Sequence, residues 1–264
     1  MKVDINQYDL VVINSSGGKD SLCALYMLNG IAEHNNYPKD QIIVSHQDLG
    51  DMEWDGVQDL VIEQANLFGF ETVIEKRVDK NGYQENLLEY AERRGKWPSR
   101  SQRWCTSDFK RGPGDKVLRR LANQREAKNV LYIFGFRADE STDRAKKKRL
   151  SQNHRLSTKK RKVWEFNIVL HWDLERVWRV IINNSLPYHW AYDIGMPRLS
   201  CVFCIFAPKD ALVIAGKKNP KLLDRYIATE KKIGHTFKNG FAIAEVKKLI
   251  NNGYEPKAIP NWGM

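Results

Sequence analysis

The feature that most constrains the fold is a regular alternation of short apolar segments with amphipathic ones. Five apolar segments have the length of buried strands, at residues 9–14, 41–46, 71–78, 129–136 and 163–169. Helical patterns separate the first four, at residues 20–34, 53–68, 84–94 and 108–123. This alternation predicts an α/β fold, with a five-stranded, mostly parallel sheet and helices on both faces. Ligands of such sheets bind at the carboxyl ends of the strands.

Beyond residue 169 the pattern is helical, at residues 173–183, 209–216, 220–233 and 242–251. We expect one domain over residues 1–208 and a helical C-terminal extension over residues 209–264. Apolar residues make up 42% of the chain, which excludes a disordered protein. The first ten residues are too polar for a signal peptide, and no apolar run reaches the length of a membrane span. We therefore expect a cytoplasmic protein without a membrane partner.

A polar loop, SSGGKDS, joins the first predicted strand to the first predicted helix. Glycines there allow close backbone approach, and successive N–H groups at a helix N-terminus form a site for anions. The lysine adds a positive charge and the serines add hydroxyl donors. The loop therefore predicts a phosphate or pyrophosphate ligand, bound by Ser16, Gly17, Gly18, Lys19 and Ser21.

Two aspartates are candidate ligands near this loop. Asp20 would suit a Mg²⁺ ion, or the first turn of the helix as an acid facing the helix dipole. Asp48 follows the second strand and could bind a ribose or a metal. His46, two residues earlier, is more typical of a histidine that is satisfied at the end of a strand.

The charge and the cysteines leave several interpretations open. The formal net charge is +11, and residues 144–162 hold ten lysines and arginines with no acidic residue. This run is either a solvated loop or a contact for phosphate or nucleic acid at the rim of the site. Cys23 lies in an apolar helical pattern and is expected in the core. The other three, Cys105, Cys201 and Cys204, are candidate metal ligands or nucleophiles.

The loop SGGKDS resembles the PP-loop of ATP pyrophosphatases and sulfonucleotide reductases, and it fits neither the Walker pattern nor the dinucleotide pattern. With the stretches RWCTSDFKRGP, GFRADESTDRA and LPYHWAYDIGMPRLSCVFC, the chain resembles the phosphoadenosine phosphosulfate (PAPS) reductase family over residues 9–208. The resemblance implies an adenine nucleotide alpha-hydrolase-like fold. It also implies that Arg137 and Arg144, assisted by Ser141, bind phosphate or sulfate groups.

Two further elements of that family are present. Lys110 and Pro113 match its K-x-x-P element, which implies a nucleotide-binding role for Lys110. The element P-Y-x-x-x-Y-D-x-G is present as Pro187, Tyr188, Tyr192, Asp193 and Gly195.

In the iron–sulfur branch of the family, an adjacent pair of cysteines and a later Cys-x-x-Cys hold a four-iron cluster. Cys201 and Cys204 supply the later pair, Cys105 supplies one member of the early pair, and Thr106 stands at the other position. Three thiolates would leave one iron open, which resembles tRNA thiolation enzymes. Zinc with His189 as a fourth ligand, and a redox disulfide between Cys201 and Cys204, are the alternatives.

From this resemblance we expect a PP-loop enzyme that binds ATP or PAPS and cleaves at the α-phosphate. Lys19, Asp20 and Cys105 are its expected catalytic residues, with Mg²⁺ on Asp20. The expected reaction is sulfur transfer to tRNA or DNA, with sulfur from a donor protein.

The alternatives are a sulfonucleotide reductase that uses thioredoxin, a non-catalytic nucleotide-binding subunit of a sulfur-modification or defence complex, and a zinc-stabilised nucleic-acid binder. No cysteine follows Cys204 in this sequence. The C-terminal Glu-Cys-Gly-type nucleophile of assimilatory reductases therefore has no counterpart in it.

Overall fold

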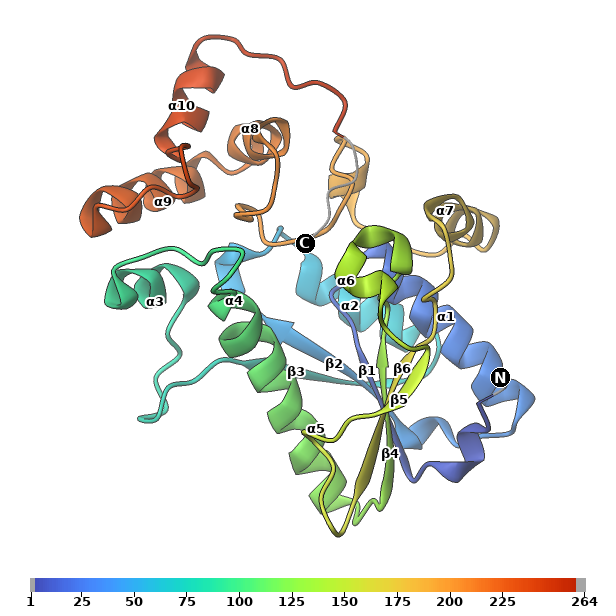
Figure 1. Ribbon diagram of the computed structural model, residues 1–264. Coiled ribbons are helices and arrows are strands. Elements are labelled where there is room, and N and C mark those ends of the chain that lie inside the picture. The colour runs from blue at the N-terminus through green and yellow to red at the C-terminus, as the bar shows by residue number, and fades with distance from the viewer. Residues whose placement is uncertain (1–2, 260–264) are drawn as a thin grey trace. The chain divides into compact units, whose positions relative to one another are not determined.

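A computed structural model describes residues 3–259 of the chain. Its sheet has six strands in the order β3-β2-β1-β4-β6-β5 (Figure 1). β1 pairs in parallel with both β2 and β4, and β4 pairs in parallel with β6. The strands are β1 Leu10–Asn14, β2 Ile42–Asp48, β3 Glu71–Lys76, β4 Asn129–Phe134, β5 Leu150–Gln152 and β6 Lys162–Asn167.

The predicted α/β fold class is confirmed, and the predicted number of strands is corrected from five to six. The additional strand is β5, which lies inside the basic run and pairs antiparallel to β6 at the edge of the sheet. Its three residues read Leu-Ser-Gln, which is too short a stretch to show an alternating pattern. The basic run is therefore partly an edge strand and not simply a loop.

One face of the sheet packs on α5 (Gly112–Gln124). Leu10 and Val12 of β1 belong to one buried cluster with Val117, Leu118 and Leu121 of α5. The residues between them in β1 point to the opposite face, because side chains alternate along a strand. Figure 1 shows α1 (Lys19–His34) covering that opposite face. The sheet is thus buried on both faces, as a parallel sheet requires.

Several helices begin later than the sequence pattern predicts, for local reasons. α2 (Val57–Asn66) starts after Gly56, which has a φ of 86°. α3 (Leu87–Arg94) starts after Asn86, whose side chain caps the backbone N–H groups of Leu88 and Glu89. The predicted helix at 108–123 consists of most of a π-helical turn (Ser107–Arg111), which follows the short α4 (Trp104–Thr106), and of α5.

The chain forms two compact units. The sheet unit comprises Met1–Gln47, Gly56–Glu75 and Pro113–His189, and it includes α1, α2, α6 (Thr142–Ala145) and α7 (Leu174–Asn183). The helical unit comprises Asp48–Asp55, Lys76–Gly112 and Trp190–Met264. It includes α3 and the C-terminal helices α8 (Lys209–Lys218), α9 (Pro220–Ile233) and α10 (Ala244–Asn251). The predicted domain boundary at residue 208 stays a prediction.

Aromatic side chains form the centre of the helical unit. Trp97 stacks on Tyr226 with 5.5 Å between ring centroids, and Phe237 meets both rings edge-on. Over residues 3–259, no helix has the length and apolar character needed to cross a membrane.

Candidate functional site

The loop between β1 and α1 is wound around two serine hydroxyls. The Oγ of Ser15 accepts the N–H of Gly17 at 3.2 Å. The Oγ of Ser21 donates to the carbonyl of Gly18 at 2.8 Å and lies 3.4 Å from the N–H of Ser16. Gly17 has a φ of 68°, a conformation that favours glycine. The sequence therefore fixes a tight loop at the N-terminus of a 16-residue helix, which is a suitable place for an anion.

A chain of buried charges lies behind this loop. The Nζ of Lys19, a residue only 2% exposed, is 3.4 Å from Oδ2 of Asp20. The other oxygen of Asp20 accepts the Nε–H of Arg137 at 2.6 Å. Arg137 is fully buried and also binds Asp139 at 2.5 Å through Nη1. Burial alone would lower the pKa of Arg137, but the charges of Asp20 and Asp139 outweigh it and raise the pKa.

The second guanidinium nitrogen of Arg137, Nη2, is buried without a hydrogen-bond partner in the described chain. Nδ2 of Asn14, the last residue of β1, is in the same condition. Buried donors are nearly always satisfied, so these two donors are available to a polar ligand or to water near the loop.

The element after β4 is held together by Glu140. Its carboxylate accepts the backbone N–H of Arg137 at 2.9 Å and pairs with the side chain of Arg144. The Oγ of Ser141 accepts the N–H of Arg144 at 3.3 Å and caps α6. The structure thus brings Arg137 to the loop, and it places Ser141 and Arg144 one step further along the same network.

Sequence reasoning missed Gly135, which lets β4 approach the loop. A Cβ at this position would lie 2.7 Å from the carbonyl oxygen of Asp20 and 2.9 Å from the nitrogen of Ser21. Only glycine fits against that backbone. The signal was present, because this glycine is the first residue of the G-x-R element.

Gln64 was missed as well. It is fully buried on α2, where its Nε2 donates to the carbonyls of Gly17 at 3.3 Å and Pro187 at 2.9 Å. A polar residue at a core position of an amphipathic helix was the available signal. His46, which we expected to be satisfied at the end of its strand, has Nδ1 3.0 Å from the carbonyl oxygen of Ser15.

The two aspartates expected to bind metal or ribose already have partners. Both oxygens of Asp20 contact cations, Arg137 and Lys19, so a Mg²⁺ ion there would have to replace one of them. Asp48 binds Lys76 at 2.9 Å and accepts the N–H of Gly50 at 2.5 Å. Their roles as ligands stay predictions.

Three thiols come together in the helical unit. Cys105 lies on α4, directly before the π-helical turn, and Cys201 and Cys204 lie in the loop before α8. Burial raises the pKa of each thiol. The three thiols lie close enough for each to influence the pKa of another. Cys23, by contrast, is in the core, where its thiol contacts the carbonyl of Val177 at 3.5 Å.

Lys110 lies near Cys105, Cys201 and Cys204, three cysteines that we call the thiol group. The negative charge of the Cys201 thiolate, with those of Glu53 and the other two cysteines, raises the pKa of Lys110 to about 12 against the opposing effect of burial. The groups that raise the pKa of Lys110 are thus the thiols and Glu53, and its predicted contact with a nucleotide stays a prediction.

Three thiols are a donor set that suits iron–sulfur clusters and zinc. Their positions do not yet form a metal centre, since no three His, Cys, Asp or Glu residues within 3–259 converge in a way that could hold an ion. The donor chemistry agrees with a cluster and the arrangement does not. The cluster and the zinc alternative with His189 therefore stay predictions.

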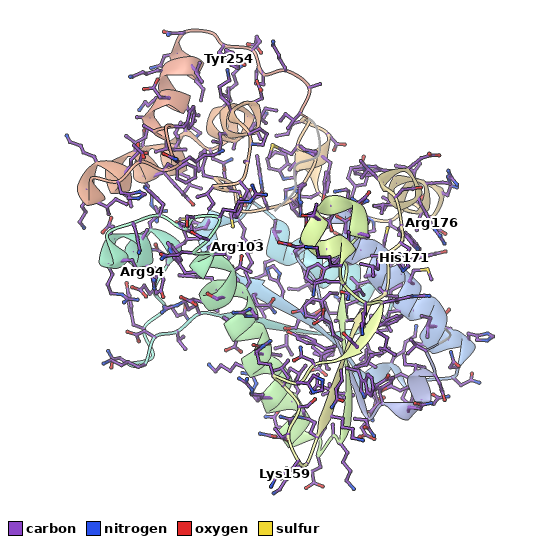
Figure 2. All side chains as sticks on the ribbon, viewed as in Figure 1. Arg94, Arg103, Lys159, His171, Arg176 and Tyr254 are labelled. Atoms are coloured by element: carbon purple, nitrogen blue, oxygen red, sulfur yellow. The ribbon has the colours of Figure 1, made fainter. Side chains whose placement is uncertain are left out.

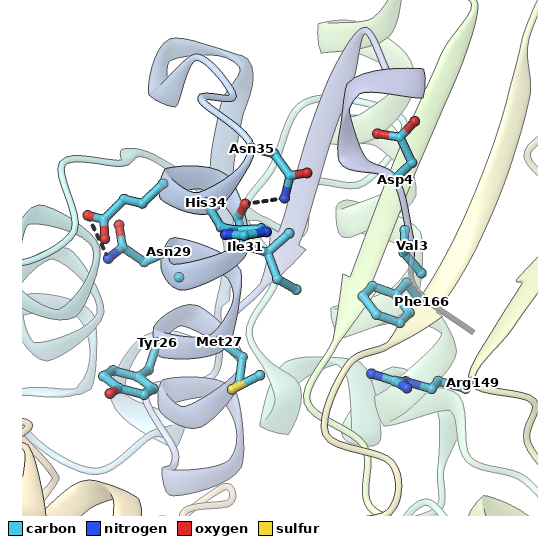
Figure 3. A pocket seen from close by; sticks show the side chains of 12 residues that line it. Val3, Asp4, Tyr26, Met27, Asn29, Ile31, His34, Asn35, Arg149 and Phe166 are labelled. Atoms are coloured by element: carbon cyan, nitrogen blue, oxygen red, sulfur yellow. Dashed lines mark hydrogen bonds between the residues drawn. The ribbon is translucent and has the colours of Figure 1, made fainter.

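A cavity of about 870 Å³ lies in the sheet unit beside the second half of α1 (Figure 3). Its lining includes the apolar side chains of Met27, Ile31 and Phe166 and the charged side chains of Asp4 and Arg149. None of the residues predicted for the nucleotide site lines this cavity.

The sequence model of the phosphoadenosine phosphosulfate reductase domain family matches residues 10–207, well over half of the chain. The chain belongs to this reductase domain family. The matched range contains the PP-loop, the element around Arg137 and all four cysteines. The family assignment that the motifs predicted is therefore confirmed.

Curated relatives are similar over part of their length. An uncharacterized protein of Methanocaldococcus jannaschii is 27% identical over 217 residues, which are 82% of this chain and 40% of that protein. An adenosine 5'-phosphosulfate reductase of Bacillus anthracis is 33% identical over 84 residues, 32% of this chain and 33% of the reductase. The chain thus spans less than half of the length of these relatives.

Solved structures with a similar course of the chain include a PAPS reductase of Candida auris, with a TM-score of 0.47, 19% identity and coverage of 72% of this chain and 80% of that one. A U34-tRNA thiolase of Methanococcus maripaludis with its [4Fe-4S] cluster has a TM-score of 0.46, 15% identity and coverage of 91% and 71%.

Proposed function

We propose that the sheet unit binds an adenine nucleotide, ATP or a sulfonucleotide, with its phosphates over residues 16–21. The observation that carries this proposal is the buried pair of cations behind the loop, Lys19 and Arg137, with Nη2 of Arg137 unpartnered within the described chain. A buried lysine and arginine at a helix N-terminus suit a phosphate better than any neutral ligand. Membership of the reductase domain family supports the same ligand class.

The reaction that fits best is cleavage at the α-phosphate. An oxygen of the acceptor attacks the α-phosphorus of ATP, pyrophosphate leaves, and the acceptor becomes adenylylated. Lys19 neutralises charge that develops on the phosphate oxygens, and Asp20 keeps Arg137 in place beside them. Mg²⁺, when bound with the nucleotide, would supply further neutralisation of the phosphates.

The thiol group supports sulfur transfer as the second half of the reaction. We propose that sulfur from a donor protein is carried as a persulfide on Cys105. The outer sulfur attacks the activated carbon, and AMP leaves with the acceptor's oxygen. The thiol of Cys201 or Cys204 then releases the acceptor's sulfur by forming a disulfide with Cys105, which an external dithiol reduces. The basic run favours a nucleic acid, tRNA or DNA, as the acceptor.

Pyrophosphate release tests the first half directly. The protein is incubated with ATP, Mg²⁺ and a pool of cellular tRNA or DNA fragments, and pyrophosphate and AMP are quantified. We expect release that depends on the nucleic acid and is lost in Lys19→Met, which keeps the length of the side chain and removes its charge. Equal release by Lys19→Met would contradict the assignment of the loop.

A sulfonucleotide reductase is the second candidate, and the family match together with the similarity to a Bacillus adenosine 5'-phosphosulfate reductase favours it. Incubation with PAPS or adenosine 5'-phosphosulfate and reduced thioredoxin separates the two functions. Release of sulfite in this incubation, with no pyrophosphate released from ATP in the assay above, would replace ATP-dependent sulfur transfer with reduction.

A further inference from the structure

The most basic part of residues 144–162 forms a tight turn between β5 and β6. The N–H of Thr158 donates to the carbonyl of Arg161 at 2.8 Å, and the N–H of Arg161 donates back at 3.3 Å. Lys159 and Lys160 occupy the two central positions and are exposed. Figure 2 shows Lys159 at the tip of this turn, beyond the last residues of α5.

Backbone and side-chain contacts add cations from neighbouring elements. The N–H of Lys162 donates to the carbonyl of Lys128 at 2.7 Å. Nη1 of Arg161 donates to Oδ1 of Asn123 at 2.9 Å, and Arg119 lies one helical turn before Asn123 on α5. We call the resulting surface the basic end; it comprises Arg119, Lys128, Lys159, Lys160, Arg161 and Lys162.

The basic end lacks the counter-charges found elsewhere on the same elements. Arg155 of the run pairs with Asp115, Lys147 pairs with Glu165, and Arg120 of α5 pairs with Glu75. No cation of the basic end has an ion pair with any residue between 3 and 259. The nearby carboxylate of Asp9 is occupied by the backbone N–H groups of Lys128 and Asn129.

Arg161 is the fixed element of this surface. It is 9% exposed, and its Nε has no hydrogen-bond partner within the described residues. Burial and the charge of Arg119 lower its pKa, so the folded chain holds the guanidinium in an unfavourable position. A fixed, partly desolvated arginine without an acid is a site that an incoming anion would stabilise.

The basic end is remote from the nucleotide loop. Lys128 directly precedes β4 and Lys162 begins β6, so both lie at the amino ends of the parallel strands. The PP-loop follows the carboxyl end of β1. A six-residue strand such as β4 spans about 20 Å. Of the two interpretations of the basic run, a contact at the rim of the nucleotide site therefore applies only to its beginning near Arg144.

We propose that the basic end binds the phosphate backbone of the nucleic-acid acceptor at a distance of about 20 Å or more from the reacting phosphate. The identity of the acceptor rests on the proposed function, and the binding surface does not. The charges favour a polyanion, and no large exposed hydrophobic side chain of the described chain belongs to this surface, which argues against a protein or membrane partner. Mobile lysines around one fixed arginine suit repeated phosphates.

Fluorescence anisotropy with a labelled RNA hairpin and a DNA duplex of equal length tests the proposal, between 50 and 200 mM salt. The test variant is Lys159→Ala/Lys160→Ala, at exposed turn positions that contribute nothing to the core. The matched control is Lys217→Ala/Lys218→Ala on α8, which removes the same charge from the helical unit. Circular dichroism confirms the fold of both variants.

With four to six phosphates contacted, wild-type affinity should fall roughly 10²- to 10³-fold over this range of salt. The turn variant should bind about tenfold more weakly and with a salt slope smaller by about 2, while the control should bind as wild type. Equal binding by the turn variant would overturn the proposal, and so would tighter binding to polyglutamate or to anionic vesicles than to RNA and DNA. ATP binding by the wild type is measured alongside. A wild type that binds RNA or DNA but not ATP would contradict the proposed function and leave the proposed binding surface intact.

Discussion

The two candidate sites of this chain hold their reactive groups in different electrostatic surroundings. At the PP-loop of the sheet unit, the charges are paired with opposite ones, from Lys19 through Asp20 to Arg137 and Asp139. In the helical unit, three thiols lie near Lys110 and raise its pKa together with Glu53. The first site is charged and held rigid by hydrogen bonds. The second consists of thiols whose pKa burial raises, with the charges of Lys110 and Glu53 nearby.

The difference indicates what each site requires before it can act. A paired network is preorganised, and an anion can accept from Nη2 of Arg137 without rearrangement of the chain. Thiols whose pKa is raised by burial need a further cation, a metal or a transferred sulfur to change their state.

Breaking the paired network should have the largest effect. Arg137→Ala leaves the carboxylates of Asp20 and Asp139 without their shared partner, and we expect unfolding free energy to fall by roughly 3–5 kcal/mol. Chemical denaturation measures this loss. The control is Arg179→Ala, whose exposed pair with Glu175 should contribute less than about 0.5 kcal/mol. Equal losses in both variants would show that the buried network is not special.

The approach of β4 to the loop should be nearly as sensitive. Gly135→Ala places a methyl group 2.7 to 2.9 Å from the backbone of Asp20 and Ser21, so the start of α1 must shift. We expect about 1–3 kcal/mol of destabilisation, together with loss of nucleotide binding. Gly30→Ala, also at α1, meets nothing within 4 Å and should be neutral or stabilising. A Gly135→Ala protein that still binds ATP normally would refute the role of this contact.

The thiol group can be tested independently of any activity. Protein purified without oxygen is assayed for iron, zinc and acid-labile sulfide. If a cluster is bound, Cys105→Ser should lose the metal while Cys23→Ser, in the core, should keep it. Absence of metal from the wild type would end the cluster hypothesis and leave the persulfide route.

A small effect of pH on the unfolding free energy should come from Glu85, a paired carboxylate outside the two candidate sites. Hydrogen bonds from Arg93 and the charges of Arg93 and Arg77 hold the pKa of Glu85 below its ordinary value of 4.5, although burial opposes them. Glu85 therefore contributes stability that is complete above pH 4.5 and is lost as pH falls through the lowered folded pKa. Glu85→Gln should flatten the acid side of the stability profile. An unchanged profile would mean that these pairs are as weak as surface pairs.

Much of the sheet unit followed from the sequence because its signals are local. The apolar runs marked β1 and β4, and the glycines and lysine of the PP-loop marked the turn between β1 and α1. β5 escaped because three residues carry no periodic pattern. The partners of Asp20 and Asp48 also escaped, since Arg137 and Lys76 reach them from distant positions in the sequence. Such pairs are set by packing, which no single-sequence pattern reports.

For the three thiols, the resemblance to the family was informative and the local sequence pattern was not. Family resemblance predicted that Cys105, Cys201 and Cys204 act together, and the structure brings them near one another. Nothing in the spacing alone indicated that Lys110 lies beside them, because the π-helical turn Ser107–Arg111 alters the helical register at that point.

We propose that the loop at residues 16–21 binds the phosphates of an adenine nucleotide through Lys19. Isothermal titration of ATP, with and without Mg²⁺, into the wild type and Lys19→Met tests it most directly. We predict measurable binding by the wild type and a loss of at least about tenfold in the variant, since one charge-assisted contact to phosphate contributes about 1.5–3 kcal/mol. Equal affinity in the two proteins, or no binding of ATP, PAPS or AMP by the folded wild type, would contradict the account.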